Sequence, residues 1–399
     1  MHAKVEGFYP LALSFALCAT DSAAQTLPSI DVRTWRPPID PEGGLVLEPV
    51  HTPGSWQYNV GVSANYAEAP VALRDPTSGH VVARPLARVL SADVIAGVGV
   101  GERGAVGIDF PGFVWQSGSS SLRSSIVTGG AVPKAGLGDV ALSGKLAFLS
   151  NDWQGVRAGF GLALLGTVTL PSGDRASFMG DGSTTATLLA LAEYALGVGA
   201  ARAAVGYKLR AEQHTWPQEP GGVSVGDEIP WAVDLAIRPK VFASALDAAD
   251  RQQWEVGFHG ALPAGPVAPF GWGRAGASAL SPLLVALGDR IALGHNGDAY
   301  WVAGSEFGLD DGLGVPTFRV IVSLGWAPRS HDRDSDGVPD EVDECPDLPE
   351  DRDGIQDADG CPEDDADSDG VLDEQDACPL VPGAASADPR KNGCPASTP

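Results

Sequence analysis

Carboxylates recur near the C-terminus at a spacing that suits a divalent cation. One loop begins at Asp332 and carries Gly337 at its sixth position. Its carboxylates stand at positions 1, 3, 5, 9 and 12: Asp332, Asp334, Asp336, Asp340 and Asp343. Calcium takes about six to eight oxygen ligands, alternate residues of a curling backbone supply them, and glycine permits the sharp turn. The pattern therefore predicts a calcium-binding loop.

The same loop recurs 33 residues later, with a shorter copy between the two. The second full loop carries carboxylates at the same positions: Asp365, Asp367, Asp369, Asp373 and Asp376. The shorter copy contributes Asp351, Asp353, Asp357 and Asp359. We expect these side chains to be the metal ligands and Ca²⁺ to be the cofactor. The alternative is an acidic, solubilising tail that binds no metal.

Four cysteines lie in the same acidic region: Cys345, Cys361, Cys378 and Cys394. Their gaps of 16, 17 and 16 residues suggest the pairs Cys345–Cys361 and Cys378–Cys394. A proline follows Cys345 and Cys378, which argues against an EF-hand because each of its loops needs a following helix. The region has few apolar residues to form a core, so metal and disulfides must take its place.

The net charge is divided unequally along the chain. The whole sequence of 399 residues has a net charge of −25. Residues 330–399 contain 22 acidic and 4 basic residues, a net −18, which leaves −7 for the rest. An acidic tail repels nucleic acid and anionic headgroups, so nucleic acid is not an expected partner. A cation is its natural ligand.

Residues 1–24 have the features of a secretory signal. Lys4 precedes the apolar stretch 8–19, and small residues at 22–24 then offer a cleavage site. Export would place the cysteines in an oxidising compartment, where disulfides persist. No apolar run reaches the ~18–20 residues of a membrane-spanning helix, so a helical membrane protein is not expected.

Residues 54–328 alternate between apolar and polar side chains with a period of two. Val106, Ile108 and Phe110, for example, bracket Gly107 and Asp109. Each run is close to the ~9–11 residues of a tilted membrane strand. Long and short connections alternate through the first eight strands, and aromatic residues cluster near strand ends, as in outer-membrane barrels.

This pattern predicts an all-β fold, an antiparallel transmembrane β-barrel of about twelve strands (about 10–14). A loop-rich, calcium- and disulfide-stabilised repeat tail follows it over residues 329–399. A soluble β-sandwich is the alternative, since it also alternates. The weakest strand prediction is 278–293, which contains Pro282 and could be helical.

The polar set of the alternation would line the barrel lumen. Its mixed signs favour a salt-bridged, plugged interior, with a solute path as the alternative. Residues 25–53 have no strong periodicity and are expected to form a periplasmic strap or to enter the lumen. The charged residues expected inside are Asp109, Lys145, Arg157, Arg202, Lys208, Arg210, Asp234, Arg238, Glu255, His259 and Arg319.

Two short motifs suggest enzymes but lack the required context. Glycines at 99, 101 and 104 match a dinucleotide fingerprint, yet a strand rather than a helix is expected after them. The Gly-x-Ser-x-Gly of 222–226 lies in a Gly/Pro-rich loop and not in a strand-to-helix elbow. We find no catalytic constellation and expect no enzymatic activity.

The repeats over about 332–395 resemble thrombospondin type 3 repeats, in which Asp-rich calcium loops alternate with Cys-Pro. A signal, a barrel and such repeats together resemble the outer membrane protein A family. In that family, the repeats link the barrel to a peptidoglycan-binding domain. This sequence ends at Pro399 without room for that domain, so wall anchoring by that route is not expected.

The sequence thus predicts an outer-membrane barrel with a periplasmic calcium-binding stalk and a structural role in the cell envelope. An even number of strands returns both termini to the periplasm. Outer-membrane lipid, calcium, and the cell wall or another envelope protein are the expected partners. The alternatives are a porin-like channel for small solutes and a secreted calcium-dependent adhesin.

Overall fold

The alternating sequence forms long β-strands in the computed structural model of the chain. The structure describes residues 31–74, 80–118, 135–149, 152–153, 156–157, 159–174, 178–212, 214–216, 223–264, 281–294, 297–328, 338, 342–345, 348–350, 359–362, 365 and 369–395. Within these ranges the regular structure is strand, with only short 3₁₀ turns besides. No helix among the described residues is long and apolar enough to cross a membrane.

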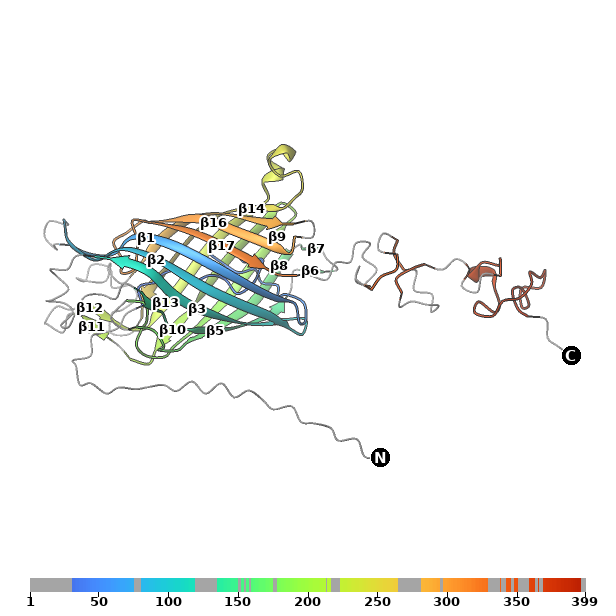
Figure 1. Ribbon diagram of the computed structural model, residues 1–399, viewed down its shortest axis with the longest axis horizontal. Coiled ribbons are helices and arrows are strands. Elements are labelled where there is room, and N and C mark those ends of the chain that lie inside the picture. Colours follow the sequence, from blue (N-terminus) through green and yellow to red (C-terminus); the bar gives the residue numbers. More distant parts are fainter. Residues whose placement is uncertain are drawn as a thin grey trace, which may run out of the picture.

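Twelve antiparallel strands form the barrel wall, each paired with its neighbours in chain order (Figure 1). They are β1 (Tyr58–Arg74), β2 (Val81–Val100), β3 (Gly104–Ser117), β5 (Ala141–Leu149), β8 (Gly159–Thr169), β9 (Thr185–Leu196), β10 (Gly199–Arg210), β13 (Glu228–Ile237), β14 (Gln252–Pro263), β15 (Leu283–Leu293), β16 (Ala299–Gly308) and β17 (Phe318–Trp326).

The sheet closes on itself because the first and last strands pair. In the β1–β17 ladder, Val60 lies opposite Trp326 and Tyr66 opposite Val320. β2 in turn pairs with both β1 and β3, so the ring has no free edge. Closure confirms the barrel prediction and shows that the β-sandwich alternative is wrong.

The two faces of each strand separate apolar from polar side chains. On β1, Val62 is 53% exposed on the outside while Ser63 is fully buried inside. Ser63 meets its cross-strand neighbour Ser323, whose hydroxyl lies 2.8 Å from the Ser63 hydroxyl. An apolar outer surface with a polar interior is the pattern of barrels that lie in lipid.

The connections differ between the two ends of the barrel. One end, called here the short-turn end, has tight connections at 101–103 and 197–198, and β1 begins and β17 ends there. The other end, the long-loop end, carries longer segments such as 211–227. The connection 238–251 is long for the short-turn end and contains η2 (Pro239–Val241) and η3 (Ser244–Leu246).

One sequence prediction needs correction. The alternation predicts a first strand at 56–66 and a long loop at 67–80, but β1 continues to Arg74, and β1 and β2 stay paired as far as Arg74 opposite Val81. The weakest strand prediction, 278–293, is confirmed, because this segment contains strand β15 and is not helical. β15 pairs with both β14 and β16, and its first paired residue is Leu283. Pro282 does not disrupt this pairing because it precedes the strand.

Minor elements lie outside the ring of twelve strands. β4 (Gly136–Leu137) pairs with β3, and β11 (His214–Trp216) pairs with β12 (Val223–Val225) in a long-loop hairpin. β6 (Asp152–Trp153) pairs with β7 (Val156–Arg157) at the short-turn end. The tail contains η5 (Asp373–Gln375).

The apolar core of the barrel lies inside its lumen and includes residues that precede β1. Trp35 and Leu45 pack with Tyr300 and Ile321 in one buried cluster. Three clusters in all combine wall residues with residues from 31–53. The N-terminal segment therefore forms part of the core.

The closed wall predicts the behaviour of an integral outer-membrane protein. Unboiled protein should sediment with outer membranes and migrate faster in SDS gels than boiled protein, because strands paired on both edges offer detergent no edge to open. Membrane fractionation with and without boiling measures both properties. Recovery in the soluble fraction without detergent would contradict this prediction.

Candidate calcium repeats and an occupied lumen

Residues 31–53, called here the lumenal segment, run along the inside of the barrel. At the long-loop end, the Val32 N–H donates to the Phe178 carbonyl at 3.2 Å. At the short-turn end, the Trp56 N–H donates to the Gly99 carbonyl at 3.0 Å. The segment therefore enters the lumen at the long-loop end, crosses it and turns into β1 at the opposite end.

The centre of the lumenal segment is held by a buried lysine of β5. The Lys145 ammonium lies 2.5 Å from Asp40 and 3.4 Å from Glu48, both of the lumenal segment. It also donates to the Pro49 carbonyl at 3.1 Å. The Lys145 and Asp40 side chains are 0% and 1% exposed. Because a buried ammonium is costly without partners, this cluster fixes the position of the segment.

Wall carboxylates also bind the backbone of the lumenal segment. Glu255 of β14 accepts the N–H groups of Leu45 and Val46 at 2.6 and 2.9 Å. Arg202 of β10 donates to the Leu47 carbonyl at 3.1 Å. A Cβ at Gly44 would lie 1.9 Å from a Glu255 oxygen, so only glycine allows this approach.

Ion pairs continue toward the long-loop end. Arg36 pairs with Asp109 of β3 at 3.1 Å and with Asp31 at 3.0 Å. The Asp31 N–H donates to Asp181 at 3.2 Å, and Asp181 pairs with Lys208 at 3.0 Å. These pairs connect the start of the segment to wall and loop residues.

A cavity of about 320 Å³ remains beside these ion pairs. Its lining combines apolar residues such as Leu165 and Leu189 with Arg36, Lys208 and Arg210. The long-loop end also contains a buried loop carboxylate, Asp139, which accepts the Gly173 N–H at 2.7 Å. Burial raises the pKa of Asp139, while the N–H donors of Gly173 and Asp181 oppose that rise.

The structure supports most of the predicted lumenal residues. Arg238 is wrongly predicted: its side chain is 46% exposed, because β13 ends at Ile237 and Arg238 begins the long connection 238–251. The Arg157 side chain lies outside the described residues. The residues confirmed on the inner face, by burial or by pairing with buried groups, are Asp109, Lys145, Arg202, Lys208, Arg210, Asp234, Glu255, His259 and Arg319.

The sequence did not reveal the partners of these wall charges. Some partners lie on the wall itself, as in the pairs Arg202–Asp234 and Arg319–Glu306. Others lie in the lumenal segment, whose residues follow no period of two or 3.6. The available signal was compositional: a proline- and glycine-rich stretch that nevertheless carries charges of both signs. The segment's charged residues that pair with wall charges are Arg33, Arg36, Asp40 and Glu48, while Asp31 pairs with Arg33 and Arg36 within the segment.

The described part of the tail contains six of the fourteen predicted calcium ligands: Asp343, Asp359, Asp365, Asp369, Asp373 and Asp376. Eight lie outside the described residues: Asp332, Asp334, Asp336, Asp340, Asp351, Asp353, Asp357 and Asp367. In the second full loop, Asp365 accepts the N–H groups of Asp369 and Gly370 at 3.2 and 2.8 Å. Gly370 has φ +89°, which explains why a glycine stands at this turn.

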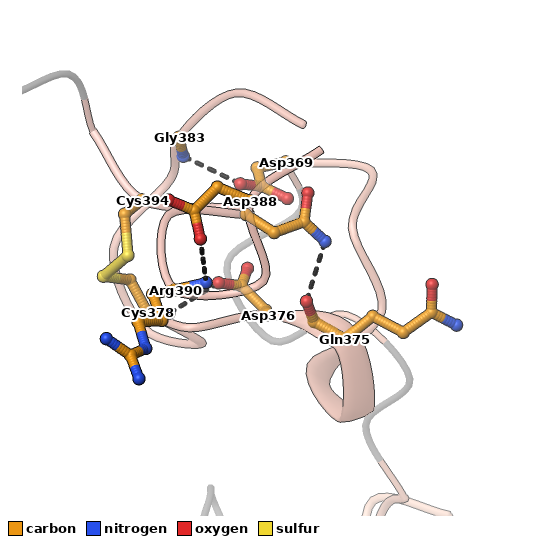
Figure 2. Close-up of a disulfide and its surroundings, with 9 residues drawn as sticks. Asp369, Gln375, Asp376, Cys378, Gly383, Asp388, Arg390 and Cys394 are labelled. Carbon is orange, nitrogen blue, oxygen red and sulfur yellow. Dashed lines mark hydrogen bonds between the residues drawn. A yellow bond between two sulfur atoms is a disulfide. The ribbon is translucent and has the colours of Figure 1, made fainter. Parts of the chain in front are cut away.

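Two disulfides divide the tail into equivalent units. The pairs are Cys345–Cys361 and Cys378–Cys394, as the spacing suggested, each with a Cα separation of 5.0 Å. In both units the first cysteine donates its N–H to the aspartate two residues earlier. Cys345 donates to Asp343 at 2.7 Å. Cys378 donates to Asp376 at 2.6 Å, and Figure 2 shows this second unit.

These aspartates provide the test of whether calcium fits. One carboxylate oxygen of Asp343 and one of Asp376 are buried without a hydrogen-bond partner. A buried anionic oxygen without a donor is costly unless a cation approaches it. Among the described residues, no three His, Cys, Asp or Glu side chains gather closely enough to hold a metal. The donors fit calcium, although the described residues alone do not form a complete site.

Comparison with known proteins supports the division into barrel and repeats. Residues 330–351 and 350–386 match the family model of the thrombospondin type 3 repeat. An outer-membrane channel from Pseudomonas putida F1 is similar over 71% of this chain and 100% of its own, with 12% identity and a TM-score of 0.50. The NanC porin aligns over 68% of this chain and 99% of its own, with 7% identity and a TM-score of 0.41. No curated protein sequence matches the chain.

Fold, repeats and comparisons together define the class of the protein. It is a twelve-stranded β-barrel of the outer-membrane type, followed by thrombospondin type 3 repeats, which typically bind calcium. At 12% identity, the likeness to the Pseudomonas channel shows a shared fold and nothing finer.

The buried lysine gives the first prediction for this site. Lys145→Ala should lower the free energy of unfolding by roughly 3–5 kcal/mol, because Asp40 and Glu48 would lose their buried cation. Urea titration of the vesicle-embedded protein, followed by tryptophan fluorescence, measures the change. Lys240→Ala is the matched control: this lysine is 43% exposed, and its loss should cost at most about 1 kcal/mol. Equal effects would contradict the role of Lys145.

The unpartnered carboxylate oxygens give a second prediction. Asp343→Asn and Asp376→Asn should each weaken calcium binding on the order of tenfold, because each removes an anionic ligand. The new amide oxygen can still accept the cysteine N–H, so the disulfides should form. Isothermal titration of the full chain in detergent measures the affinity. Asp388→Asn is the control, since Asp388 is exposed and lies outside the loops; an equal loss there would argue against specific sites.

Proposed function

We propose that the protein is a closed outer-membrane barrel that carries a calcium-ordered stalk and has a structural role in the cell envelope. The observation that supports the proposal is the occupied lumen. Lys145 of β5 and Glu255 of β14 both point inward and bind the lumenal segment from two different parts of the wall. A segment held by buried ion pairs and backbone hydrogen bonds closes the pore in its resting state.

The lumenal segment would keep the pore closed because it packs against apolar wall residues and hydrogen-bonds with polar ones. Trp35 and Leu45 fill apolar space beside Ile321, and the Trp35 indole N–H donates to the Leu45 carbonyl at 2.8 Å. Arg290 of β15 donates to the Pro41 carbonyl at 3.0 and 2.7 Å. Displacing the segment would expose apolar side chains and unpair charges, which opposes opening.

The stalk begins where β17 ends, at the short-turn end of the barrel. In outer-membrane barrels short turns face the periplasm, so we place the stalk there. Calcium, when bound, would neutralise the tail carboxylates and remove their mutual repulsion. Asp343 and Asp376 would each contribute an oxygen next to a disulfide, which ties the ordered loop to a covalent crosslink. The resulting rod would separate the barrel from the cell wall or from another envelope protein.

This role requires no catalysis, and we propose that the protein is not an enzyme. The resemblance to the outer membrane protein A family supports a spacer function for the repeats. Anchoring to peptidoglycan is not part of the proposal.

A channel for small solutes is the second candidate function. The cavity of about 320 Å³ beside Arg36, Lys208 and Arg210 favours it, because a partial displacement of the lumenal segment would extend that cavity. The Pseudomonas protein with the same fold is described as a channel. On this view the lumenal segment would be a gate instead of a permanent plug.

Conductance in planar lipid bilayers separates the two candidates. The wild-type protein should be silent, whereas the double variant Lys145→Ala, Glu255→Ala should open frequently, because it removes two of the contacts that hold the segment. Lys240→Ala should remain silent, since Lys240 lies outside the lumen. Steady conductance of the wild-type protein would favour the channel and overturn the closed-barrel proposal.

A further inference from the structure

The connection 238–251, called here the foot, is unusual for the short-turn end of the barrel. In Figure 1 it appears as a yellow coil that stands out sideways from the wall beside β14. Its backbone forms the two 3₁₀ turns η2 and η3 and hydrogen-bonds internally. The Phe242 N–H donates to the Pro239 carbonyl at 3.0 Å, and the Leu246 N–H to the Ala243 carbonyl at 3.0 Å. Local hydrogen bonds let a segment approach lipid without exposing unsatisfied backbone groups.

The foot exposes large apolar side chains. Val241, Phe242 and Leu246 are 48%, 64% and 45% exposed. Apolar residues that neither pack into a core nor lie within a strand of the wall mark an interaction surface. The described residues provide no protein surface that covers them.

This apolar surface is continuous with the lipid-facing surface of the barrel. The Phe242 ring stacks on Trp254 of β14, with centroids 6.3 Å apart and an interplanar angle of 23°. Trp254 points outward, in line with exposed Val256 and Phe258, while Glu255 between them points inward to the lumenal segment. Tryptophans at strand ends of outer-membrane barrels lie at the membrane–water interface. Phe242 therefore extends the interfacial surface away from the wall.

The charges of the foot suit phospholipid headgroups. Arg238 and Lys240 both pair with the same carboxylate, that of Asp250. Both cations remain 46% and 43% exposed, so one carboxylate is shared by two exposed positive charges. Apolar residues beside surplus positive charge are typical of segments that lie in the membrane interface.

We propose that the foot is a membrane anchor whose Val241, Phe242 and Leu246 side chains insert into the lipid leaflet at the short-turn end of the barrel. Arg238 and Lys240 then meet the phosphate groups of that leaflet. The anchor would fix the tilt and rotation of the barrel at the end from which the stalk departs. This inference depends on the barrel fold but not on the state of the lumen or on calcium.

Depth-dependent quenching tests the proposal on the full chain. Leu246→Cys, labelled with an environment-sensitive fluorophore in the oxidised protein, would be placed in vesicles of phosphatidylethanolamine and phosphatidylglycerol. Nitroxide-bearing lipids should quench this label several-fold more strongly than a label at Glu102→Cys, and aqueous iodide should quench it less. Glu102 is the matched control because it is exposed in the 101–103 turn at the same end.

A second variant checks that the apolar surface causes the insertion. Adding Phe242→Ser to labelled Leu246→Cys should reduce lipid quenching toward the control level, while heat-modifiable mobility should show that the barrel still folds. Lipid quenching equal to that of the Glu102 label, or unchanged by Phe242→Ser, would overturn the proposal. Iodide access without lipid quenching would show that the foot faces water or a soluble partner.

Discussion

The structure depends on one constraint: each charge that faces the lumen of a narrow barrel must be paired there. Alternation gives one face of every strand to lipid, so the polar residues of the same strand must point inward. This geometry explains why Lys145, Arg202 and Glu255 are buried inside the barrel. The lumenal segment pairs carboxylates with Lys145. Its backbone N–H groups donate to Glu255, and a backbone carbonyl accepts from Arg202. The lumenal segment thus occupies the interior because it pairs with polar groups that the wall strands place there.

Much of this architecture was predictable because it is local. The period of two specifies strands, and the alternation of loop lengths specifies a barrel with distinct ends. The cysteine pairs are equally local, since Cys345 and Cys361 enclose a loop of fixed length. Strand ends were less predictable, because the pairing of β1 with β2 beyond Glu68 depends on bulges that the sequence pattern does not mark.

The sequence left open whether residues 25–53 form a periplasmic strap or enter the lumen, and the path that residues 31–53 take inside the barrel could not be predicted, for a physical reason. Lys145 and Asp40 lie 105 positions apart in the sequence, and their contact depends on the register of every intervening strand. A segment that buries its backbone against side chains, as at Gly44 and Glu255, produces neither a helical nor a strand period. The prediction that Arg238 lines the lumen was wrong for a related reason. The alternation continues one residue past the end of β13 at Ile237, and sequence alone cannot show where strand pairing stops.

The barrel and the tail both contain charges that need partners, but the partners differ between the two. The barrel pairs its charges with groups of its own chain, which are always present at fixed stoichiometry. The tail, with a net charge of −18 over residues 330–399, has too few cations of its own, and its disulfides constrain the chain without neutralising it. Carboxylate oxygens such as those of Asp343 and Asp376 therefore remain available to an external cation. If the proposed function is correct, occupation of the lumen would not depend on calcium, because its charges are paired within the chain, whereas order in the tail would depend on it.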